Sequence, residues 1–314
     1  MRVLIGRSAW SAHALGAAVW LACCAAAAQS ADPVPAARQP KWEAGIGGLA
    51  LTLPEYPASD EYRSLLLPLP YFVYRGRVLR ADEQGSRLRR RLAPYAEIDV
   101  SGGGALASDS SGSDARRGMP DLGYLVELGP NLRLGYAGAL PRSTLVVNLP
   151  LRGVVSIGDP GVNWRGLRFV PELAYRLDGV LGTPLSLRLS LAAELASGAL
   201  HDYFYTVEPR YATAARPAYA ASAGYLGSSI GARVSRPLTR RLRGFATLRY
   251  YNYDGSASAD SPLFRAHDGY TAALGLSWSL LQSREPAFDE RQRWLLAHEA
   301  RAAQKSRRNE AGGE

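Results

Sequence analysis

The strongest constraint on this chain is a period-two alternation of apolar with small or polar side chains, in segments about ten residues long. Because successive side chains of a strand point to opposite faces, each segment has one apolar face and one polar face. A membrane barrel turns the apolar face to lipid, so the pattern predicts an antiparallel transmembrane β-barrel. The clearest segments are Pro184–Ala196, with Leu185, Leu187, Leu189, Leu191, Ala193 and Leu195 on one face, and Asp268–Leu280, with Tyr270, Ala272, Leu274, Leu276, Trp278 and Leu280.

A third segment, Leu167–Leu177, alternates in the same way but carries Arg168, Glu172 and Arg176 on its second face, which we therefore place in the lumen. Twelve strands are expected over residues 42–281, an even number as in bacterial barrels. Ten strands remains open, because three consecutive arginines at 89–91 interrupt one candidate. The weaker candidates are residues 42–51, 65–74, 77–82, 86–91, 93–101, 131–139, 143–157, 222–236 and 242–253.

The loops between these segments fall into two length classes. Residues 178–183 and 237–241 are short, as periplasmic turns are, whereas 52–64, 102–120, 197–221 and 254–266 are long, as outer loops are. The Gly, Ser and Asp content of residues 101–114 predicts a flexible loop. Aromatic residues near the strand ends fit interfacial girdles: Tyr71, Tyr74, Trp164, Tyr203, Tyr205, Tyr250, Tyr251 and Tyr253.

The two ends of the chain differ from the alternating part. Residues 1–28 are typical of a cleaved export signal, with Arg2 and Arg7 before an apolar stretch; cleavage after Ser30 is the alternative. Both cysteines, Cys23 and Cys24, lie inside it, so a mature chain would have no thiol, and a lipoprotein signal is a second alternative. We expect residues 29–41 to be a short periplasmic segment and 282–314 a charged periplasmic tail, partly helical or disordered.

Export also limits the partners. Removing residues 1–28 lowers the formal charge from +9 to about +7, and a basic exported chain meets lipopolysaccharide phosphates rather than nucleic acid. No remaining stretch reaches the roughly 18 apolar residues of a transmembrane helix. The predicted location is the outer membrane, with its lipid and lipopolysaccharide as neighbours. A soluble β-sandwich or lipocalin-like barrel, whose strands also alternate, stays open as an alternative.

Several short motifs follow one another along the chain: Trp42-Glu-Ala-Gly45, Pro54-Glu-Tyr56-Pro-Ala-Ser59-Asp60, Leu67-Pro68-Leu-Pro70-Tyr71, Gly118-Met119-Pro120-Asp121, Glu127-Leu-Gly129-Pro130, Leu149-Pro150-Leu151-Arg152, Asp202-Tyr203-Phe204-Tyr205 and Asp260-Ser261-Pro262-Leu263. In this order they resemble the MipA/OmpV family of outer-membrane proteins, and the resemblance covers residues 42–281. Two features depart from the family: Ala58 stands where glycine is usual, and the chain continues beyond its last strand.

The resemblance implies a scaffold barrel that brings together a lytic murein transglycosylase and a murein synthase, and that is inserted by the barrel-assembly machinery. It carries no catalytic residues over to this chain. The family motifs make Tyr56, Ser59, Asp60, Tyr203 and Tyr205 candidate binding positions in the outer loops.

Chemistry at the outer rim rests on His201-Asp202 and His267-Asp268, which with a serine such as Ser261 could build a hydrolase. Neighbours on a strand point to opposite faces, so neither aspartate is expected to orient its histidine. We predict no catalytic residues, no metal site and no cofactor.

Inside the barrel, Arg152, Arg168 and Arg188 are candidate lumenal residues. They could form an anion path, or they could pair with Glu172 and Glu194 and fill a narrow lumen; filling is the favoured interpretation. The sequence therefore predicts a structural or scaffold protein of the outer membrane first, a small channel or ligand-binding porin second, and a rim hydrolase third.

Overall fold

The computed structural model describes residues 40–75, 79–82, 85–88, 90–93, 95–140, 142–158 and 161–285. The segments assigned above to an export signal, to the N-terminal linker up to residue 39 and to the tail from residue 286 lie outside the described residues. In the described part, no helix combines the length and the apolar character needed to cross a bilayer.

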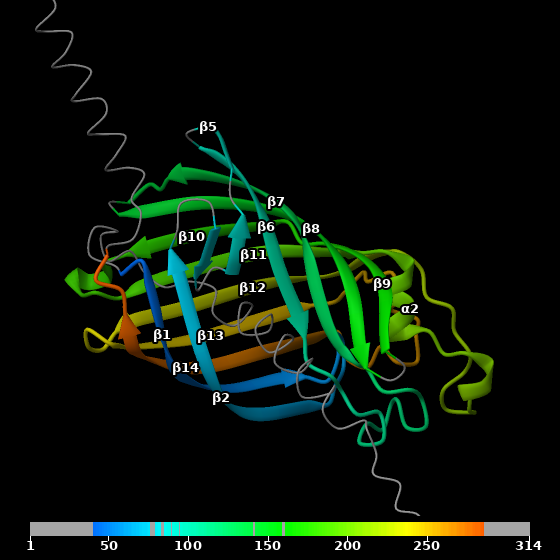
Figure 1. Cartoon of the computed structure of the whole chain (residues 1–314). Coiled ribbons are helices and arrows are strands. Elements are labelled where there is room, and N and C mark those ends of the chain that lie inside the picture. Colours follow the sequence, from blue (N-terminus) through cyan, green and yellow to red (C-terminus); the bar gives the residue numbers. More distant parts are fainter. Residues whose placement is uncertain are drawn as a thin grey trace, which may run out of the picture.

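Strands of one antiparallel sheet form almost all of the structure (Figure 1). They are β1 (Trp42–Pro54), β2 (Tyr62–Arg75), β3 (Leu79–Asp82), β4 (Gly85–Leu88), β5 (Arg90–Ala93), β6 (Ala96–Ala105), β7 (Tyr124–Ala137), β8 (Ser143–Gly158), β9 (Gly161–Phe169), β10 (Glu172–Asp178), β11 (Ser186–Ala196), β12 (Gly224–Pro237), β13 (Leu242–Asn252) and β14 (Asp268–Gln282). The described residues also form three short helices, which are η2 (Val180–Gly182), α2 (Gly198–Tyr205) and η3 (Pro209–Tyr211).

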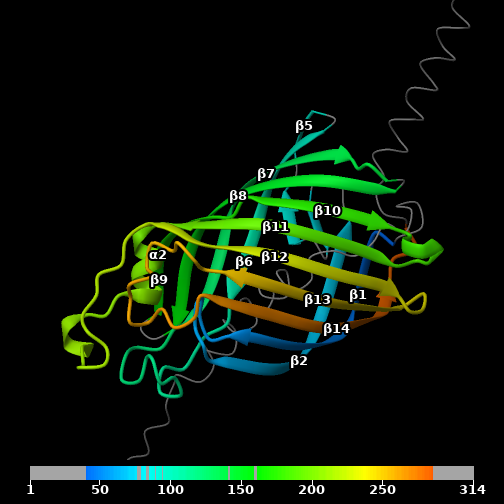
Figure 2. The same ribbon diagram turned by 180° about the vertical axis from the view of Figure 1, so that it is seen from behind.

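The sheet curls into a barrel, and the two ends of its hydrogen-bonded order, β4 and β5, are adjacent in the chain. Its order is β4-β3-β2-β1-β14-β13-β12-β11-β10-β8-β7-β6-β5, with β9 between β8 and β11. One residue separates β4 from β5 in the sequence, and only Val170 and Pro171 separate β9 from β10. Each of these pairs therefore counts as a single interrupted strand of the barrel. Counted this way, twelve strands surround the barrel, and the predicted antiparallel barrel is confirmed. Figure 2 shows the even wall from β10 to β14.

The alternation sorts side chains as predicted. On β14, Leu274, Leu276 and Trp278 are more than half exposed, whereas Ala273 and Ser279 on the other face are buried. An apolar outer face and a polar inner face are the reverse of a soluble protein, and they suit a wall immersed in lipid. Most strands accordingly line the lumen with small, polar and charged residues, whereas β1 and β2 line it with leucines.

One part of the wall lacks strand pairing. Among the described residues, β2 pairs with β3 only at Tyr74 and Arg75, and β6 pairs with β5 only from Ala96 to Ile98. The backbone edges of β2 from Tyr62 to Pro70 and of β6 from Val100 to Ala105 therefore have no ladder partner in the described part of the chain, and we call the space between them the seam. Figure 1 shows the short strands β3 and β4 between β2 and β6, at one end of the seam only.

The proline content of β2 explains the seam. Pro68 and Pro70 carry no N–H, yet β2 pairs with β1 without a register shift from Trp42↔Tyr74 to Pro54↔Tyr62. An unbroken ladder requires every donor that faces β1, so the missing donors of the two prolines must face the seam. A strand with this edge cannot form a regular ladder with β6.

Three expectations change. The strand β7 begins at Tyr124, seven residues before the expected start, so Glu127 lies inside the barrel wall. Residues 101–105, expected in a flexible loop, belong to β6, and the following loop is packed: Ser110 and Ser113 are buried. The third change is the helix α2, which stands in a segment expected to be a plain loop.

Candidate lumenal site and outer cap

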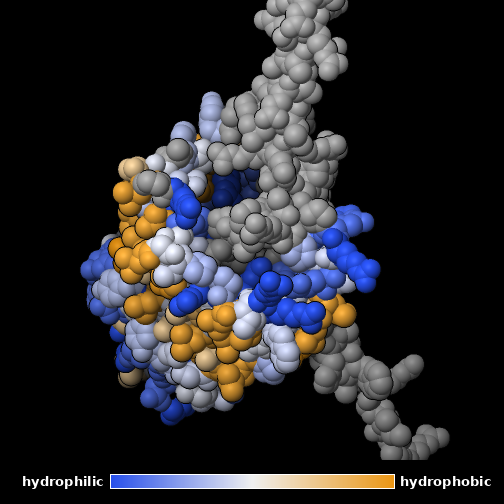
Figure 3. All heavy atoms as spheres, turned by 90° about the vertical axis from the view of Figure 1, so that its left-hand side faces the viewer, coloured by the Kyte–Doolittle hydropathy of each residue, from blue (hydrophilic) through white to orange (hydrophobic). Residues whose placement is uncertain are grey.

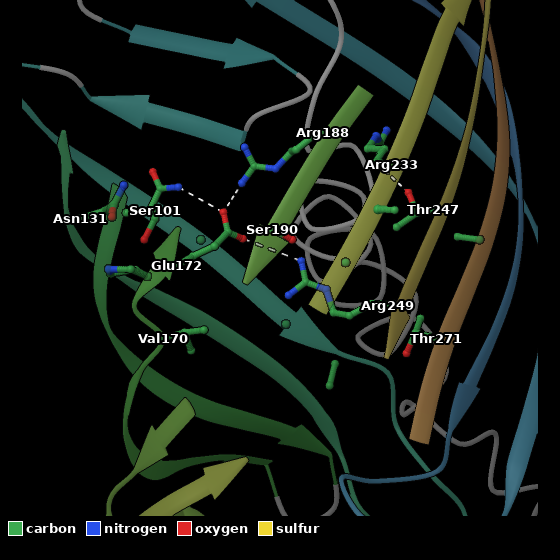
Figure 4. A pocket seen from close by; sticks show the side chains of 18 of the residues that line it. Ser101, Asn131, Val170, Glu172, Arg188, Ser190, Arg233, Thr247, Arg249 and Thr271 are labelled. Atoms are coloured by element: carbon green, nitrogen blue, oxygen red, sulfur yellow. Dashed lines mark hydrogen bonds and ion pairs between the residues drawn. The ribbon is translucent and has the colours of Figure 1, made fainter. Parts of the chain in front are cut away.

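A cavity of about 610 Å³ occupies the lumen. Alternate residues of most strands line it, because only every second side chain points inward. One wall is apolar and comes from β1 and β2: Leu49, Leu51, Leu53, Leu67 and Leu69. The opposite wall carries arginines, and Figure 4 shows Arg188, Arg233 and Arg249 projecting toward the same space as Glu172.

Glu172 is the centre of the polar wall. Its carboxylate binds Arg188, accepts a hydrogen bond from Asn148 Nδ2 at 3.2 Å and lies 3.8 Å from the guanidinium of Arg249. Arg249 also donates to Ser229 Oγ at 3.2 Å. Two arginines therefore share one carboxylate, and this part of the wall keeps a net positive charge.

A second network lies under β7. Glu127, 2% exposed, accepts hydrogen bonds from Arg168 Nη1 at 2.5 Å and Arg152 Nη1 at 3.3 Å. Arg168 also binds Glu194, with its Nε 2.7 Å from the carboxylate. The three predicted lumenal arginines, Arg152, Arg168 and Arg188, thus all lie in the lumen and are paired with carboxylates, as expected. They do not fill the lumen, however, because the cavity of about 610 Å³ remains between them and the opposite wall.

The polar wall is not balanced in charge. Seven arginines line the cavity against three carboxylates among the described residues, an excess of four positive charges. Glu127 and Glu194, which bind lining arginines from behind, reduce the excess to two. A low-dielectric barrel interior strengthens the interaction of a guanidinium group with an anion, and this wall presents several such groups to the cavity.

Sequence reasoning missed two parts of this site. Arg249 was not singled out, although it alternates with the outward Leu248 and Tyr250 and could have been assigned to the lumen from that pattern. The leucine wall was also missed, because β2 is apolar on both faces, and the sequence alone gives no sign of which leucines face inward.

The long loops cover the end of the barrel that lies opposite the short turns. The loops 55–61, 106–123, 197–223 and 253–267 meet there in one apolar core, which we call the cap. Its buried residues are Tyr56, Leu122, Leu125, Val154, Ala196, Leu200, Phe204, Tyr205, Val207, Leu226 and Leu263. The long loops therefore form a packed apolar core of their own, like that of a soluble protein, at the end of the barrel.

The predicted loop positions hold this cap together. Tyr56 donates its hydroxyl to the Leu263 carbonyl at 2.8 Å, and Tyr205 donates to the Pro57 carbonyl at 2.8 Å. Burial raises the pKa of Tyr56 to about 12 and that of Tyr205 well above its usual range. Ser59 is buried, and Asp60, on the surface, lies 3.5 Å from Arg265 Nε.

Tyr203 is half-buried on α2. It donates to the Gly123 carbonyl at 3.3 Å and lies under the guanidinium of Arg165, 4.4 Å from the ring centroid. The girdle prediction is wrong for Tyr205 and Tyr253, which are buried in or beside the cap and not on the outer wall. The helix α2 turns the Tyr205 ring inward, and the folded 253–267 loop does the same for Tyr253. The sequence pattern predicted neither the helix nor the fold of the loop.

Arg116 fixes the cap across the barrel mouth. This buried guanidinium donates to the Phe204 carbonyl at 3.0 Å and the Pro120 carbonyl at 3.2 Å, and it lies 5.8 Å from the Tyr56 ring centroid. Burial lowers the pKa of Arg116, but its guanidinium group stays charged. One side chain thus joins the 106–123 loop to the 197–223 loop.

The rim histidines do not pair with the aspartates that follow them. His201 Nδ1 lies 2.7 Å from Ser258 Oγ, and its Nε2 lies 3.3 Å from the Gly224 carbonyl. His267 instead contacts Asp254 at 2.8 Å on the exposed surface. Ser261, the third member of the considered hydrolase, donates to the Tyr205 carbonyl at 2.7 Å. In the described residues, no group of three or more metal-ligating side chains comes together.

A family model for the MltA-interacting protein MipA matches residues 46–280. This chain belongs to the MipA family. The match spans the barrel from β1 to β14, with the cap and the seam, and it confirms the resemblance inferred from the motifs. As a MipA-family barrel with a lipid-facing wall, the chain is an outer-membrane protein. No curated protein matches the chain.

Solved structures show only distant similarity. A bacterial polysaccharide outer membrane secretin aligns over 76% of this chain and 99% of its own, with 9% identity and a TM-score of 0.39. The toluene transporter TbuX of Ralstonia pickettii aligns over 81% and 75%, with 11% identity and a TM-score of 0.25. The monoaromatic hydrocarbon channel CymD aligns over 79% and 91%, with 10% identity and a TM-score of 0.28. At these sequence identities and TM-scores, none of the three structures supports a conclusion about this MipA-family chain.

Proposed function

We propose that this MipA-family barrel is a scaffold that holds murein-remodelling enzymes at the inner face of the outer membrane. The first partner would be a lytic murein transglycosylase, in keeping with the description of the family as MltA-interacting, and a murein synthase would be the second. The short-turn end would face the periplasm and the cap the medium, because barrels of this class have short periplasmic turns.

The observation that carries this proposal is an exposed leucine on each of three short turns. Leu140, Leu181 and Leu238 are 53%, 92% and 52% exposed. Leu181 has a positive φ of 53°, which holds its side chain on a tight turn away from the wall. Exposed apolar anchors on a polar rim are typical of protein interaction surfaces.

Basic residues surround these leucines. Arg142, Arg240 and Arg241 are exposed beside them. Figure 3 views this end of the barrel and shows hydrophobic and hydrophilic patches side by side around its rim. Such a surface favours a partner whose contact face has apolar pockets and acidic neighbours, since charge complementarity steers association.

A purified transglycosylase provides the test. The protein is embedded in nanodiscs, and binding is measured by biolayer interferometry for the parent and for Leu181→Ser. Loss of an anchor is expected to weaken binding about tenfold. Val162→Ser, an equally apolar exposed residue at the opposite end of the barrel, should bind like the parent. Equal binding by all three proteins would contradict the proposed surface.

The same binding assay with a protein truncated after residue 285 tests whether the expected charged tail contributes to the contact. Weaker binding of this truncated protein would add the tail to the contact, whereas unchanged binding would leave the turns as the whole surface. Affinity capture from solubilised envelopes, followed by mass spectrometry, then identifies whether a synthase joins the complex.

A small channel is the second candidate, and the cavity with its excess of arginines favours it. The cap and the ion pairs oppose it, because the long loops cross one mouth and the arginines are bound to carboxylates. Recording in planar bilayers separates the two. A scaffold should give no steady conductance, and a conductance whose selectivity changes in Arg152→Gln or Arg188→Gln would favour the channel.

A further inference from the structure

The cavity reaches the seam. Its lining includes Leu67 and Leu69 of β2 and Ser101, Gly102, Gly104 and Ala105 of β6, the two strands that border the seam. Gly102 and Gly104 have no side chains, so β6 presents its backbone to the cavity there. Among the described residues, this stretch of β6 has a ladder partner on its β7 side only.

Several residues that border the seam are small or lack an N–H donor. Gly102 and Gly104 give β6 no side chains there, and Pro68 and Pro70 deprive β2 of two donors. The lipid-facing side of β2 is apolar, with Leu66 79% and Phe72 56% exposed. A path between the strands would therefore join the lumen to the hydrocarbon layer of the membrane.

Both ends of the seam are fixed. Near the cap, Arg63 of β2 donates to the carbonyls of Ala107 and Leu106 and lies 3.5 Å from Glu55. Glu55 in turn accepts a hydrogen bond from Ser108 Oγ at 2.6 Å. At the opposite end, β3, β4 and β5 fill the wall. The seam is thus a bounded side opening in the backbone ladder.

Polarity changes in steps across the lumen. One row of paired residues runs Arg176, Arg188, Arg233, Thr247, Ala273, Leu51 and Leu65, each opposite the next on a neighbouring strand. The row passes from guanidinium groups to leucines within one circuit of the wall. The leucine end lies on β1 and β2, next to the seam.

From this geometry we infer that the lumen binds a single-chain anionic amphiphile, which enters sideways from the membrane through the seam. The alkyl chain lies against Leu49, Leu51 and Leu67, and the anionic head binds Arg249 and Arg188, which share the carboxylate of Glu172. The volume of about 610 Å³ lies in the range of roughly 300–1,000 Å³ typical of small-molecule sites. The head can be a carboxylate or a phosphate monoester, since arginine binds both.

Radiolabelled laurate tests the site in a scintillation proximity assay with the full chain in nanodiscs and with empty nanodiscs as background. We expect saturable binding, with dodecanol a competitor at least about tenfold weaker, because it lacks the charge that the arginines bind. Dodecyl phosphate is the second competitor. A preference for laurate assigns a free fatty acid as the source of the head, and a preference for dodecyl phosphate assigns a phosphate-headed lipid.

Three variants locate the parts of the site. Arg249→Gln should weaken laurate binding about tenfold and leave dodecanol unchanged, whereas Arg210→Gln, an exposed arginine of the outer loops, should change neither. Leu51→Asn should weaken both ligands. Gly102→Phe should slow laurate association, because its Cβ has ordinary contacts only, at 3.5 Å and beyond with β7, and its ring would add bulk on the lipid-facing side of β6 beside the seam.

Gly48→Phe is the matched control for the seam. Gly48 lies on the lipid-facing side of the fully paired strand β1, and a Cβ there meets no atom within 4 Å. If Gly48→Phe slowed association as much as Gly102→Phe, entry through the seam would be wrong. Non-saturable binding, or dodecanol binding as tightly as laurate, would overturn the site itself. Transglycosylase binding is read separately, so failure here leaves the scaffold proposal standing.

Discussion

The Nδ1 atom of His201 lies 2.7 Å from the Oγ atom of Ser258, and both side chains are fully buried between the 197–223 and 253–267 loops. The Nε2 atom faces the Gly224 carbonyl and so carries the proton, while Nδ1 accepts from the serine hydroxyl. Burial lowers the pKa of His201, and the Gly224 carbonyl and the carboxylates of Glu194 and Asp202 oppose this only in part. This neutral histidine joins two loops of the cap.

The first prediction is that the cap loosens in mild acid. The unfolded loops take up a proton on His201 near the usual pKa of about 6.5, whereas the folded cap resists it to lower pH. The stabilisation is therefore complete above pH 6.5 and decreases as the pH falls below it. Hydrogen exchange of residues 198–207, corrected for the intrinsic pH dependence, should show faster opening at pH 5.5 than at pH 7.5. An identical pH effect in His201→Asn would contradict this assignment.

A second prediction concerns the buried carboxylate of Glu127. Glu127→Gln leaves Arg152 and Arg168 without their shared anion, and breaking a buried ion pair costs about 3–5 kcal/mol. Reversible urea unfolding in lipid vesicles measures the loss. Asp114→Asn, which removes an exposed partner of Arg117, should cost less than about 1 kcal/mol. Similar losses in the two variants would mean that Glu127 is solvated.

Ala58 supplies the third prediction. It stands where the family usually has glycine, and its φ of 59° is left-handed, a conformation that costs an L-residue about 1–2 kcal/mol. Ala58→Gly should therefore change stability by less than about 1 kcal/mol, because relief of strain offsets the lost methyl group. Ala58→Val should be strongly destabilising. Ala174→Gly, at a buried strand position, is the control and should cost more than Ala58→Gly.

The backbone at Ala58 explains why the strain persists. Its carbonyl accepts hydrogen bonds from Arg265 N at 2.8 Å and Ala266 N at 3.0 Å, which fix the first loop on the last one. If Ala58→Gly destabilised the cap as much as Ala174→Gly destabilises the wall, the left-handed conformation would not be strained.

The fourth prediction tests the lipid-facing wall. Leu276 is 53% exposed near the middle of β14, and an arginine at a lipid-facing midplane position costs about 2–4 kcal/mol. Leu276→Arg should show this loss in vesicle unfolding, while Leu276→Phe should be nearly neutral. A neutral Leu276→Arg would place this position outside the hydrocarbon layer.

Sequence reasoning was most accurate for the wall. The alternation of Leu189 and Leu191 with Ser190, or of Leu274 and Leu276 with Ala273, depends only on neighbours in the chain and on the two faces of a strand. The lumenal position of Arg152, Arg168 and Arg188 followed from the same rule. The family motifs added the identity of the barrel, which the match of the MipA family model to residues 46–280 confirms.

The class of fold, the faces of its strands and the family could thus be derived from the order of the amino acids. Three features came from the three-dimensional structure: Arg188 and Arg249 share Glu172, the described part of β2 leaves its edge unpaired beside β6, and Tyr205 and His201 turn inward beneath a cap. These features join residues far apart in the chain, so they depend on strand register and on how four loops pack together. Local periodicity contains no information about either.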